Sequence, residues 1–316
     1  MNRKLLVSLG IVVFLIAVIV INKWEPGSGV KGPGVIETPA DEISVRAEGY
    51  SLKLVKSGDR WLINDQKYPA DTGLVTDLEK KVSEVKLLDL ISEKGYFNKY
   101  DLAEDKGVEV TLSAGGKQLR KLMIGKQGLT NSQVYVRIDD SNEVYLASGL
   151  TSEEMRPEAD TLRDRKILEV SVDEVASFVI NYKGREFFFL KEDKKVEAAD
   201  TQEDEKKSAP AEALWVCKGF ESVKLDSRRI NNILRSFSPL RAASFPDTPV
   251  TGSILCTVKI NTPGKEYNLK IYSKKEKEMY FAVSPESPYV FTLGGWQTEK
   301  FFIKDIKDFE KKKDAK

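Results

Sequence analysis

The sequence predicts an α+β protein in which two tandem related domains, each an antiparallel sheet with a helix packed on one face, follow an N-terminal transmembrane helix. Three observations lead to this fold class. The chain opens on a long uncharged apolar run, one order of strands, turn and amphipathic helix occurs twice, and short polar turns such as "AGGK" and "DDSN" join the later strands. A length of 316 residues is enough for two domains of ordinary size.

Residues 1–24 have the features of an uncleaved signal anchor. Arg3 and Lys4 precede the uncharged run 5–21, whose length at about 1.5 Å per residue nearly matches a hydrocarbon layer of about 30 Å. A cleaved signal peptide, the alternative, has a shorter apolar region and a small-x-small site that "VINKWE" lacks. Because positive charge precedes the span, we expect the N-terminus inside the cytoplasm and the body of the protein outside it.

Residues 25–41 are rich in Gly and Pro, which predicts a flexible linker. They contain a formal G-x-G-x-x-G at Gly27, Gly29 and Gly32. A dinucleotide site needs a strand before this motif and a helix after it, whereas here an apolar span precedes it and Pro33 follows. We therefore expect no nucleotide site in the linker.

The first repeat domain, 42–150, begins with three predicted strands, the third of which carries Trp61. The "YPAD" turn then places Asp71 as the N-cap of a helix. One apolar stripe at helical spacing is expected to mark the buried face of that helix, namely Leu74, Val75, Leu78, Val82, Val85 and Leu88. Four antiparallel strands follow, from "VEVTLSA" to "EVYLAS".

The second repeat domain, 169–305, has the same order of elements. Trp215 lies in a strand, and Asp226 precedes a helix with Ile230, Ile233, Leu234 and Phe237. Nearly equal offsets separate the two tryptophans and the two aspartates. We expect both tryptophans to be structural core residues facing the helix, and both aspartates to be structural helix caps.

Three polar segments complete the organisation. They are a connector helix at 151–168, a charged, Ala-rich disordered insertion at about 191–213, and a charged tail at 306–316. Cys217 and Cys256 both lie in apolar, strand-like runs. Two buried thiols are expected, and a disulfide between them is the alternative that the sequence leaves open.

Composition and motifs point away from catalysis. The absence of histidine excludes Ser-His-Asp catalysis and His-ligated metals, and the near balance of 50 Lys plus Arg against 49 Asp plus Glu gives no field for nucleic acid. No Walker loop is present. Ser83 and Lys86 match S-x-x-K on the solvated face of the predicted helix, and the acidic pairs 139–140 and 153–154 fall at a turn and a helix start. We identify no catalytic, cofactor-binding or metal-ligating residue and expect a protein that is not an enzyme and needs no cofactor.

Several motifs resemble domain-of-unknown-function family 4340, namely "W-L-I", the "PAD" turn, "YDL", "MIG", "VYVR…VYL" and the connector "LRDRKIL". The second domain departs from them, because "VKLD" replaces "YPAD" and no "YDL" is present. The resemblance implies a bacterial, membrane-anchored protein that often carries the unit twice. It also implies association, in some relatives, with gliding-type ABC transport systems as auxiliary subunits, and it assigns no catalytic residues.

These observations predict a single-pass protein of the bacterial cytoplasmic membrane with a periplasmic or otherwise extracytoplasmic body. The expected role is that of a non-catalytic, partner-binding subunit of an envelope complex of the ABC-transport or motility kind. The alternative is an anchored receptor for a glycan, lipid or peptide held between the two domains.

Overall fold

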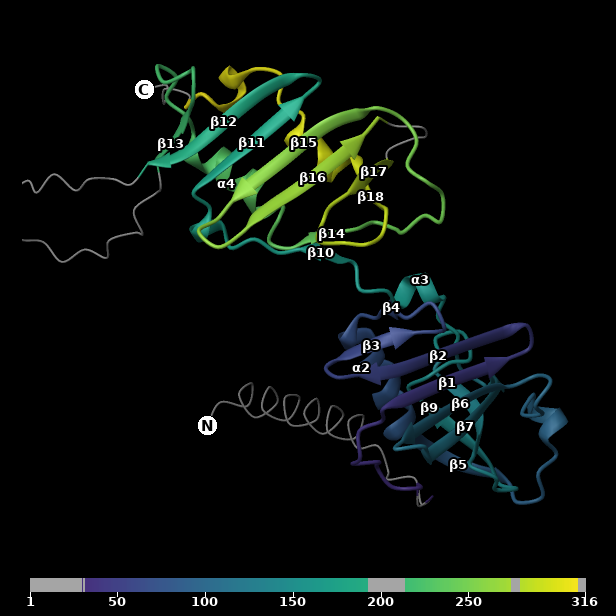
Figure 1. Ribbon diagram of the computed structural model, residues 1–316. Coiled ribbons are helices and arrows are strands. Elements are labelled where there is room, and N and C mark those ends of the chain that lie inside the picture. The colour runs from purple at the N-terminus through teal and green to yellow at the C-terminus, as the bar shows by residue number, and fades with distance from the viewer. Residues whose placement is uncertain (1–29, 31, 193–213, 274–278, 312–316) are drawn as a thin grey trace, which may run out of the picture. The chain divides into compact units, whose positions relative to one another are not determined.

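The computed structural model describes residue 30 and residues 32–192, 214–273 and 279–311 (Figure 1). The predicted anchor and nearly all of the predicted insertion lie outside these residues. Within them, no helix has the length and apolar character that a membrane span requires. The chain divides into two compact units, unit 1 at 1–164 and unit 2 at 165–316. The predicted α+β class with antiparallel sheets is confirmed.

Unit 1 is built on a nine-stranded sheet in which every neighbouring pair of the described strands is antiparallel. The strand order is β4-β3-β2-β1-β6-β7-β8-β9-β5. The strands are β1 (Glu42–Ala47), β2 (Tyr50–Ser57), β3 (Arg60–Ile63), β4 (Tyr68–Pro69), β5 (Lys86–Ser92), β6 (Val108–Ala114), β7 (Lys117–Gln127), β8 (Gln133–Ile138) and β9 (Val144–Ser148).

Helix α2 (Thr72–Ser83) contributes Val75, Leu78 and Val82 to the same hydrophobic core as these strands. The helix ends at Ser83, so the prediction that its stripe continues through Val85 to Leu88 is wrong. Residues Lys86–Ser92 instead form β5, which pairs with β9. Pairing with a sheet edge satisfies the backbone of this segment and overrides its helical spacing, which is a weak local preference.

The described part of the predicted linker, 32–41, contacts unit 1 at two points. The buried guanidinium of Arg120 donates to the carbonyl oxygens of Gly34 (2.8 Å) and Ser83 (2.7 Å), and so ties the linker to the end of α2. The backbone N–H of Ala40 donates to Glu79 Oε1 at 2.7 Å. A charged donor that is shielded from water by its own acceptors fixes the segment despite its Gly and Pro content.

A second, smaller cluster lies on the other side of the unit 1 sheet. Its buried members are Tyr100, Leu102, Met123 and Val144, and the 3₁₀ helix η1 (Phe97–Tyr100) leads into it. Met123 alternates along β7 with Leu122 and Ile124 of the main core, so its side chain points to the opposite face. The irregular segment that carries "YDL" therefore covers part of this face.

Unit 2 contains a seven-stranded antiparallel sheet in the order β13-β12-β11-β15-β16-β17-β18, and a two-stranded sheet of β10 with β14, among the residues described. The strands are β10 (Lys166–Leu168), β11 (Ser177–Tyr182), β12 (Arg185–Glu192), β13 (Leu214–Cys217), β14 (Leu240–Arg241), β15 (Ile254–Asn261), β16 (Glu266–Tyr272), β17 (Met279–Val283) and β18 (Phe291–Gly294).

The helices of unit 2 are short. Helix α4 (Ser227–Arg235) buries Ile230, Ile233 and Leu234 in the core of the unit and contacts β13. The remaining elements are α3 (Ala159–Leu162) at the end of unit 1, and η2 (Val172–Glu174), α5 (Gly295–Thr298), η3 (Glu299–Phe301) and η4 (Ile306–Phe309) in unit 2.

The two units share one order of pairing. The sheet β3-β2-β1-β6-β7-β8-β9 of unit 1 corresponds strand by strand to β13-β12-β11-β15-β16-β17-β18 of unit 2. The pairing of β5 with β9 corresponds to the bridge between Ser244 and Thr292.

In each unit, the last segment of the chain is hydrogen-bonded to the backbone of the helix-capping aspartate. The backbone N–H of Asp71 donates to Leu162 O (2.8 Å), and that of Asp226 donates to Phe309 O (2.7 Å). Ile306 and Phe309 are buried in the unit 2 core. The predicted charged tail therefore begins too early at 306, because its two apolar residues belong to the core.

Candidate functional site

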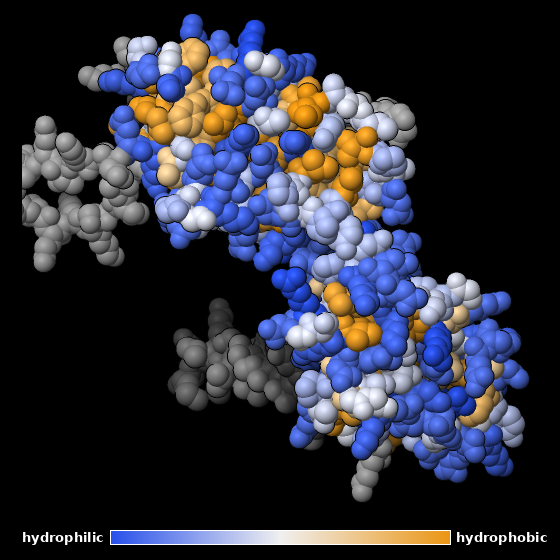
Figure 2. All heavy atoms as spheres, viewed as in Figure 1, coloured by the Kyte–Doolittle hydropathy of each residue, from blue (hydrophilic) through white to orange (hydrophobic). Residues whose placement is uncertain are grey.

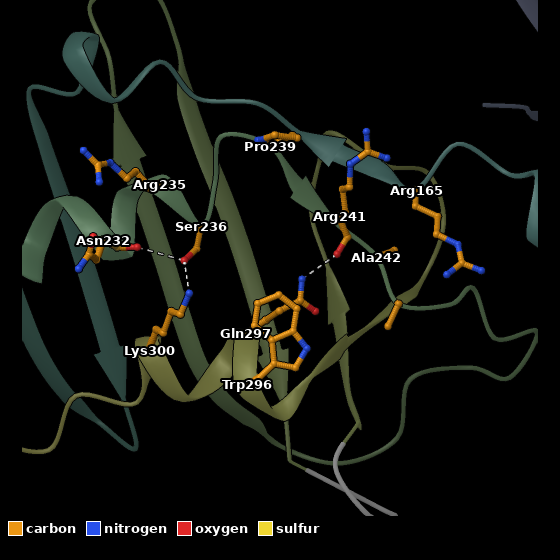
Figure 3. A pocket seen from close by; sticks show the side chains of 11 residues that line it. Arg165, Asn232, Arg235, Ser236, Pro239, Arg241, Ala242, Trp296, Gln297 and Lys300 are labelled. Carbon is orange, nitrogen blue, oxygen red and sulfur yellow. Dashed lines mark hydrogen bonds between the residues drawn. The ribbon is translucent and has the colours of Figure 1, made fainter. Parts of the chain in front are cut away.

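A hollow of about 760 Å³ lies in unit 2 between the end of α4, β14 and α5 (Figure 3). We call it the basic hollow. It is lined by Arg165, Asn232, Arg235, Ser236, Pro239, Arg241, Ala242, Ala243, Trp296, Gln297 and Lys300.

Local hydrogen bonds build the walls of the basic hollow. Gln297 joins two of its elements, because its Nε2 donates to Arg241 O (3.1 Å) and its Oε1 accepts from the backbone N–H of Gly294 (3.0 Å). Across the hollow, Lys300 Nζ donates to Ser236 Oγ (3.3 Å), and Ser236 Oγ donates to Asn232 O (3.2 Å). These bonds link α5 to β14, and η3 to the end of α4 (Figure 3).

All charged side chains that line the basic hollow are positive. Arg165, Arg235, Arg241 and Lys300 line it, and no carboxylate does. Guanidinium groups stay charged at every physiological pH and present forked N–H donors that match carboxylate and phosphate oxygens. The exposed cations Arg235 and Lys300 in this wall favour an anionic group from outside.

Trp296 adds an aromatic surface beside these cations. Its side chain is 71% exposed, and Lys300 Nζ lies 5.6 Å from its ring centroid. A large exposed aromatic residue is characteristic of binding surfaces, where indole and guanidinium groups supply much of the affinity. The hollow can therefore hold an anionic group and cover an apolar or planar neighbour of that group.

The residues singled out from the sequence lie elsewhere. Trp61 and Trp215 are buried in the cores of their own units. Asp71 Oδ1 accepts from the backbone N–H of Gly73 (2.9 Å), and Asp226 Oδ1 accepts from that of Arg228 (3.0 Å), so both act as N-caps. None of these four residues lines the basic hollow.

The two cysteines are separate buried thiols. Cys217 lies in β13 and Cys256 in β15, with β12 and β11 between them. Three strand spacings of about 4.8 Å place them about 14 Å apart, about twice the Cα separation that a disulfide spans. The disulfide alternative is therefore wrong. Burial raises the pKa of Cys217 to about 11 and that of Cys256 to about 12, so both remain protonated at neutral pH.

The sequence candidates for chemistry have structural roles. Ser83 Oγ donates to Lys80 O (3.2 Å) at the end of α2, and Lys86 is exposed on β5. Asp140 forms an ion pair with Lys121 at 2.5 Å, and Glu154 forms one with Lys81 at 3.3 Å. In the part of the chain that the structure covers, no group of three metal-ligating side chains comes together.

Two of the quoted motifs meet inside unit 1. Gly125 of "MIG" lies against Tyr100 of "YDL", and a Cβ atom at Gly125 would clash with the Tyr100 carbonyl oxygen. Ser152 Oγ donates to the carbonyl oxygen of Gly125 at 2.6 Å, on the other side of the same residue. The two motifs are therefore linked by a close approach of backbones.

Sequence reasoning missed the basic hollow. Arg165, Arg235 and Lys300 lie far apart along the chain and occur in stretches with mixed charge. The available signal was Trp296 in "GGWQTEK", which follows a pair of glycines and lies outside any alternating strand pattern.

The fold and the basic hollow together define a duplicated antiparallel α+β protein with a cation-lined depression in its second unit. A family model described as "Domain of unknown function (DUF4340)" matches residues 61–271, from β3 of unit 1 to β16 of unit 2. The chain belongs to this family. No curated protein and no solved structure matches it.

Proposed function

We propose that this protein is a membrane-anchored, extracytoplasmic and non-catalytic subunit that binds an anionic segment of a partner protein. The observation that carries the proposal is the basic hollow, where the exposed cations Arg235 and Lys300 line a depression beside the exposed Trp296. The apolar run 5–21 supports the anchor, and the positive charges before it support the orientation.

The chemistry of the basic hollow favours binding over catalysis. Arginine cannot exchange a proton near neutral pH, and Ser236, the one hydroxyl in the wall, donates to a helix carbonyl and accepts from Lys300. A serine nucleophile requires a neutral base, whereas this ammonium is exposed to solvent. The Lys300 ammonium, held beside Ser236 Oγ, and the Arg235 guanidinium instead offer charged donors for a carboxylate.

The proposed partner is a membrane protein of an ABC-type transport or motility complex in the bacterial cytoplasmic membrane. This class follows from the anchor and from the family's association with such systems. The chain has no Walker loop, so ATP hydrolysis would be supplied by another subunit of the complex.

The test is affinity purification of the full chain in mild detergent from its native membrane. We expect wild type to co-purify a membrane complex, and the double variant Arg235→Glu/Lys300→Glu to lose it, because the variant places two carboxylates in the hollow. Raising the salt concentration should weaken the wild-type complex as well, since exposed charges are screened.

The matched control is Lys259→Glu/Lys270→Glu, which makes the same charge change at two exposed residues of the unit 2 sheet. This variant should retain the complex. Loss of the complex in both variants would assign the effect to net charge. Reproducible recovery of the wild-type chain alone would contradict the subunit role.

A further inference from the structure

The outer edge of the Trp strand differs between the two units. In unit 1, β3 is covered by β4, with Leu62 opposite Pro69 and Ile63 opposite Tyr68. The backbone N–H of Ala70 completes this pairing by donating to Trp61 O at 2.8 Å. The Trp strand of unit 1 therefore has a partner on both sides.

In unit 2 the corresponding strand, β13, is the last strand of its sheet among the described residues. Leu225 of unit 2 corresponds to Ala70 of unit 1, because Leu225 forms an antiparallel bridge with Glu310 as Ala70 does with Arg163. The residues before it form turns, in which Phe220 N donates to Cys217 O (3.0 Å) and Val223 N donates to Phe220 O (3.0 Å). These turns take up the stretch that would otherwise form the missing strand.

Three polar groups of Trp215 are relevant to this edge: the backbone N–H and C=O, which face it, and the buried indole N–H. Lys218 N donates to Phe188 O (2.8 Å), so the alternation of an antiparallel ladder directs the backbone N–H and C=O of Trp215 away from β12. The Trp215 side chain is 2% exposed, and its buried indole N–H has no acceptor in the described part of the chain. A buried donor without an acceptor is costly and points to a missing partner.

A hollow of about 630 Å³ lies beside β13, and we call it the β13 slot. Its wall combines apolar side chains, among them Leu214, Trp215 and Val216, with three cations, among them Lys224 and Lys311, and three carboxylates. Leu214 of this wall is 45% exposed, and Leu190 on β12, outside the slot, is 37% exposed. Figure 2 shows apolar side chains gathered over this end of the unit 2 sheet, where Figure 1 labels β12 and β13.

We propose that the β13 slot binds an extended peptide segment of a partner protein, which adds to the unit 2 sheet as a strand in the place that β4 holds in unit 1. The proposal rests on the partner-binding function above and identifies a second contact for it. Backbone groups of the bound segment pair with the backbone of Trp215, and an oxygen atom of the segment accepts from the Trp215 indole N–H. An apolar side chain of the segment packs on Val216. A carboxylate on the segment fits near Lys224 and Lys311.

A partner segment fits the slot better than the chain's own insertion, 193–213, which begins and ends beside it. That stretch contains one valine and no isoleucine, leucine or aromatic residue, and is otherwise dominated by Lys, Asp, Glu and Ala. Lys, Asp, Glu and Ala are depleted in strands, and the single valine is the one large apolar side chain that the insertion could pack on Val216.

The test places the photo-crosslinking residue p-benzoylphenylalanine at Val216 of the full chain in its native membrane. The matched control carries it at Leu62, the half-buried counterpart of Val216 in β3, where β4 already fills the equivalent place. We expect the Val216 probe to crosslink one defined segment of another protein, and the Leu62 probe to crosslink the chain itself.

A synthetic peptide with the crosslinked sequence provides the second readout. It should slow amide hydrogen exchange at Trp215 at least tenfold in the full chain, with no such effect in Val216→Asp, whose melting temperature is checked against wild type. The proposal is overturned if the Val216 probe crosslinks to 193–213, to β13 of a second copy or to nothing, or if the peptide leaves Trp215 exchange unchanged. A complex that co-purifies without a Val216 crosslink would overturn the slot and leave the proposed function standing.

Discussion

Gly125 illustrates how one residue without a side chain sets the spacing of a whole layer. Its neighbours on β7, Ile124 and Met123, point to opposite faces of the sheet, and the Tyr100 carbonyl oxygen lies directly against it. The segment around Tyr100 can approach the strand because nothing projects from Gly125. Strand glycines commonly mark such a close approach of another backbone.

Gly125→Ala should therefore destabilise the fold. The added methyl group meets a backbone oxygen that cannot rotate away, and overpacking of this kind costs about 1–3 kcal/mol. Urea unfolding of the full chain in detergent measures the loss. Gly264→Ala is the control, because a Cβ atom there meets no atom within 4 Å. Equal stability of both variants would show that the Tyr100 segment does not press on β7.

At the scale of elements, the sequence predicts a helix boundary well where only neighbouring residues determine it. Asp71 and Asp226 could be located as helix caps because an aspartate side chain before an amphipathic run satisfies the first free N–H groups of the helix. The end of α2 could not be located, because Val85 and Leu88 keep the helical spacing while a distant strand, β9, takes the segment as β5. Tertiary pairing decides such cases, and spacing does not reveal it.

The element boundary after Ser83 gives a direct prediction. Leu87 on β5 is buried, whereas its neighbour Leu88 is 36% exposed. Leu87→Ala should cost about 2–5 kcal/mol, and Leu88→Ala should cost much less, since only the first leaves a cavity. Thermal and urea unfolding of the two variants compare them directly. The reverse order of cost would mean that the helical stripe extends to Leu88 after all.

At the scale of the whole molecule, duplication was readable from the sequence and the candidate sites were not. Trp61 with Asp71, and Trp215 with Asp226, occur at nearly equal offsets, and the two sheets share their pairing order. The basic hollow joins Arg165, Arg235 and Lys300, which only the folded chain brings together. The β13 slot becomes visible only when the two units are compared, because it is defined by a strand that one of them lacks.

Residues 306–309, which bond to the Asp226 backbone as the last segment of unit 1 bonds to Asp71, are important for the stability of unit 2. Phe309 is buried and lies edge-on to Phe189, with ring centroids 6.0 Å apart. Phe309→Ala should destabilise unit 2 by about 3–5 kcal/mol, as expected for removal of a buried phenylalanine. Exposed Lys307 in the same turn provides the control, Lys307→Ala, which should unfold with wild type in a calorimetric scan. If both variants match wild type, residues 306–309 are a tail and not part of the core.

The contact between Arg120 and the linker limits the distance between the first unit and the proposed membrane anchor. Because the Gly34 carbonyl oxygen is hydrogen-bonded to Arg120 of the first unit, only residues 25–33 connect that unit to the proposed anchor. Even a fully stretched chain of this length reaches about 30 Å. With the anchor in place, the first unit would begin within about 30 Å of the lipid surface.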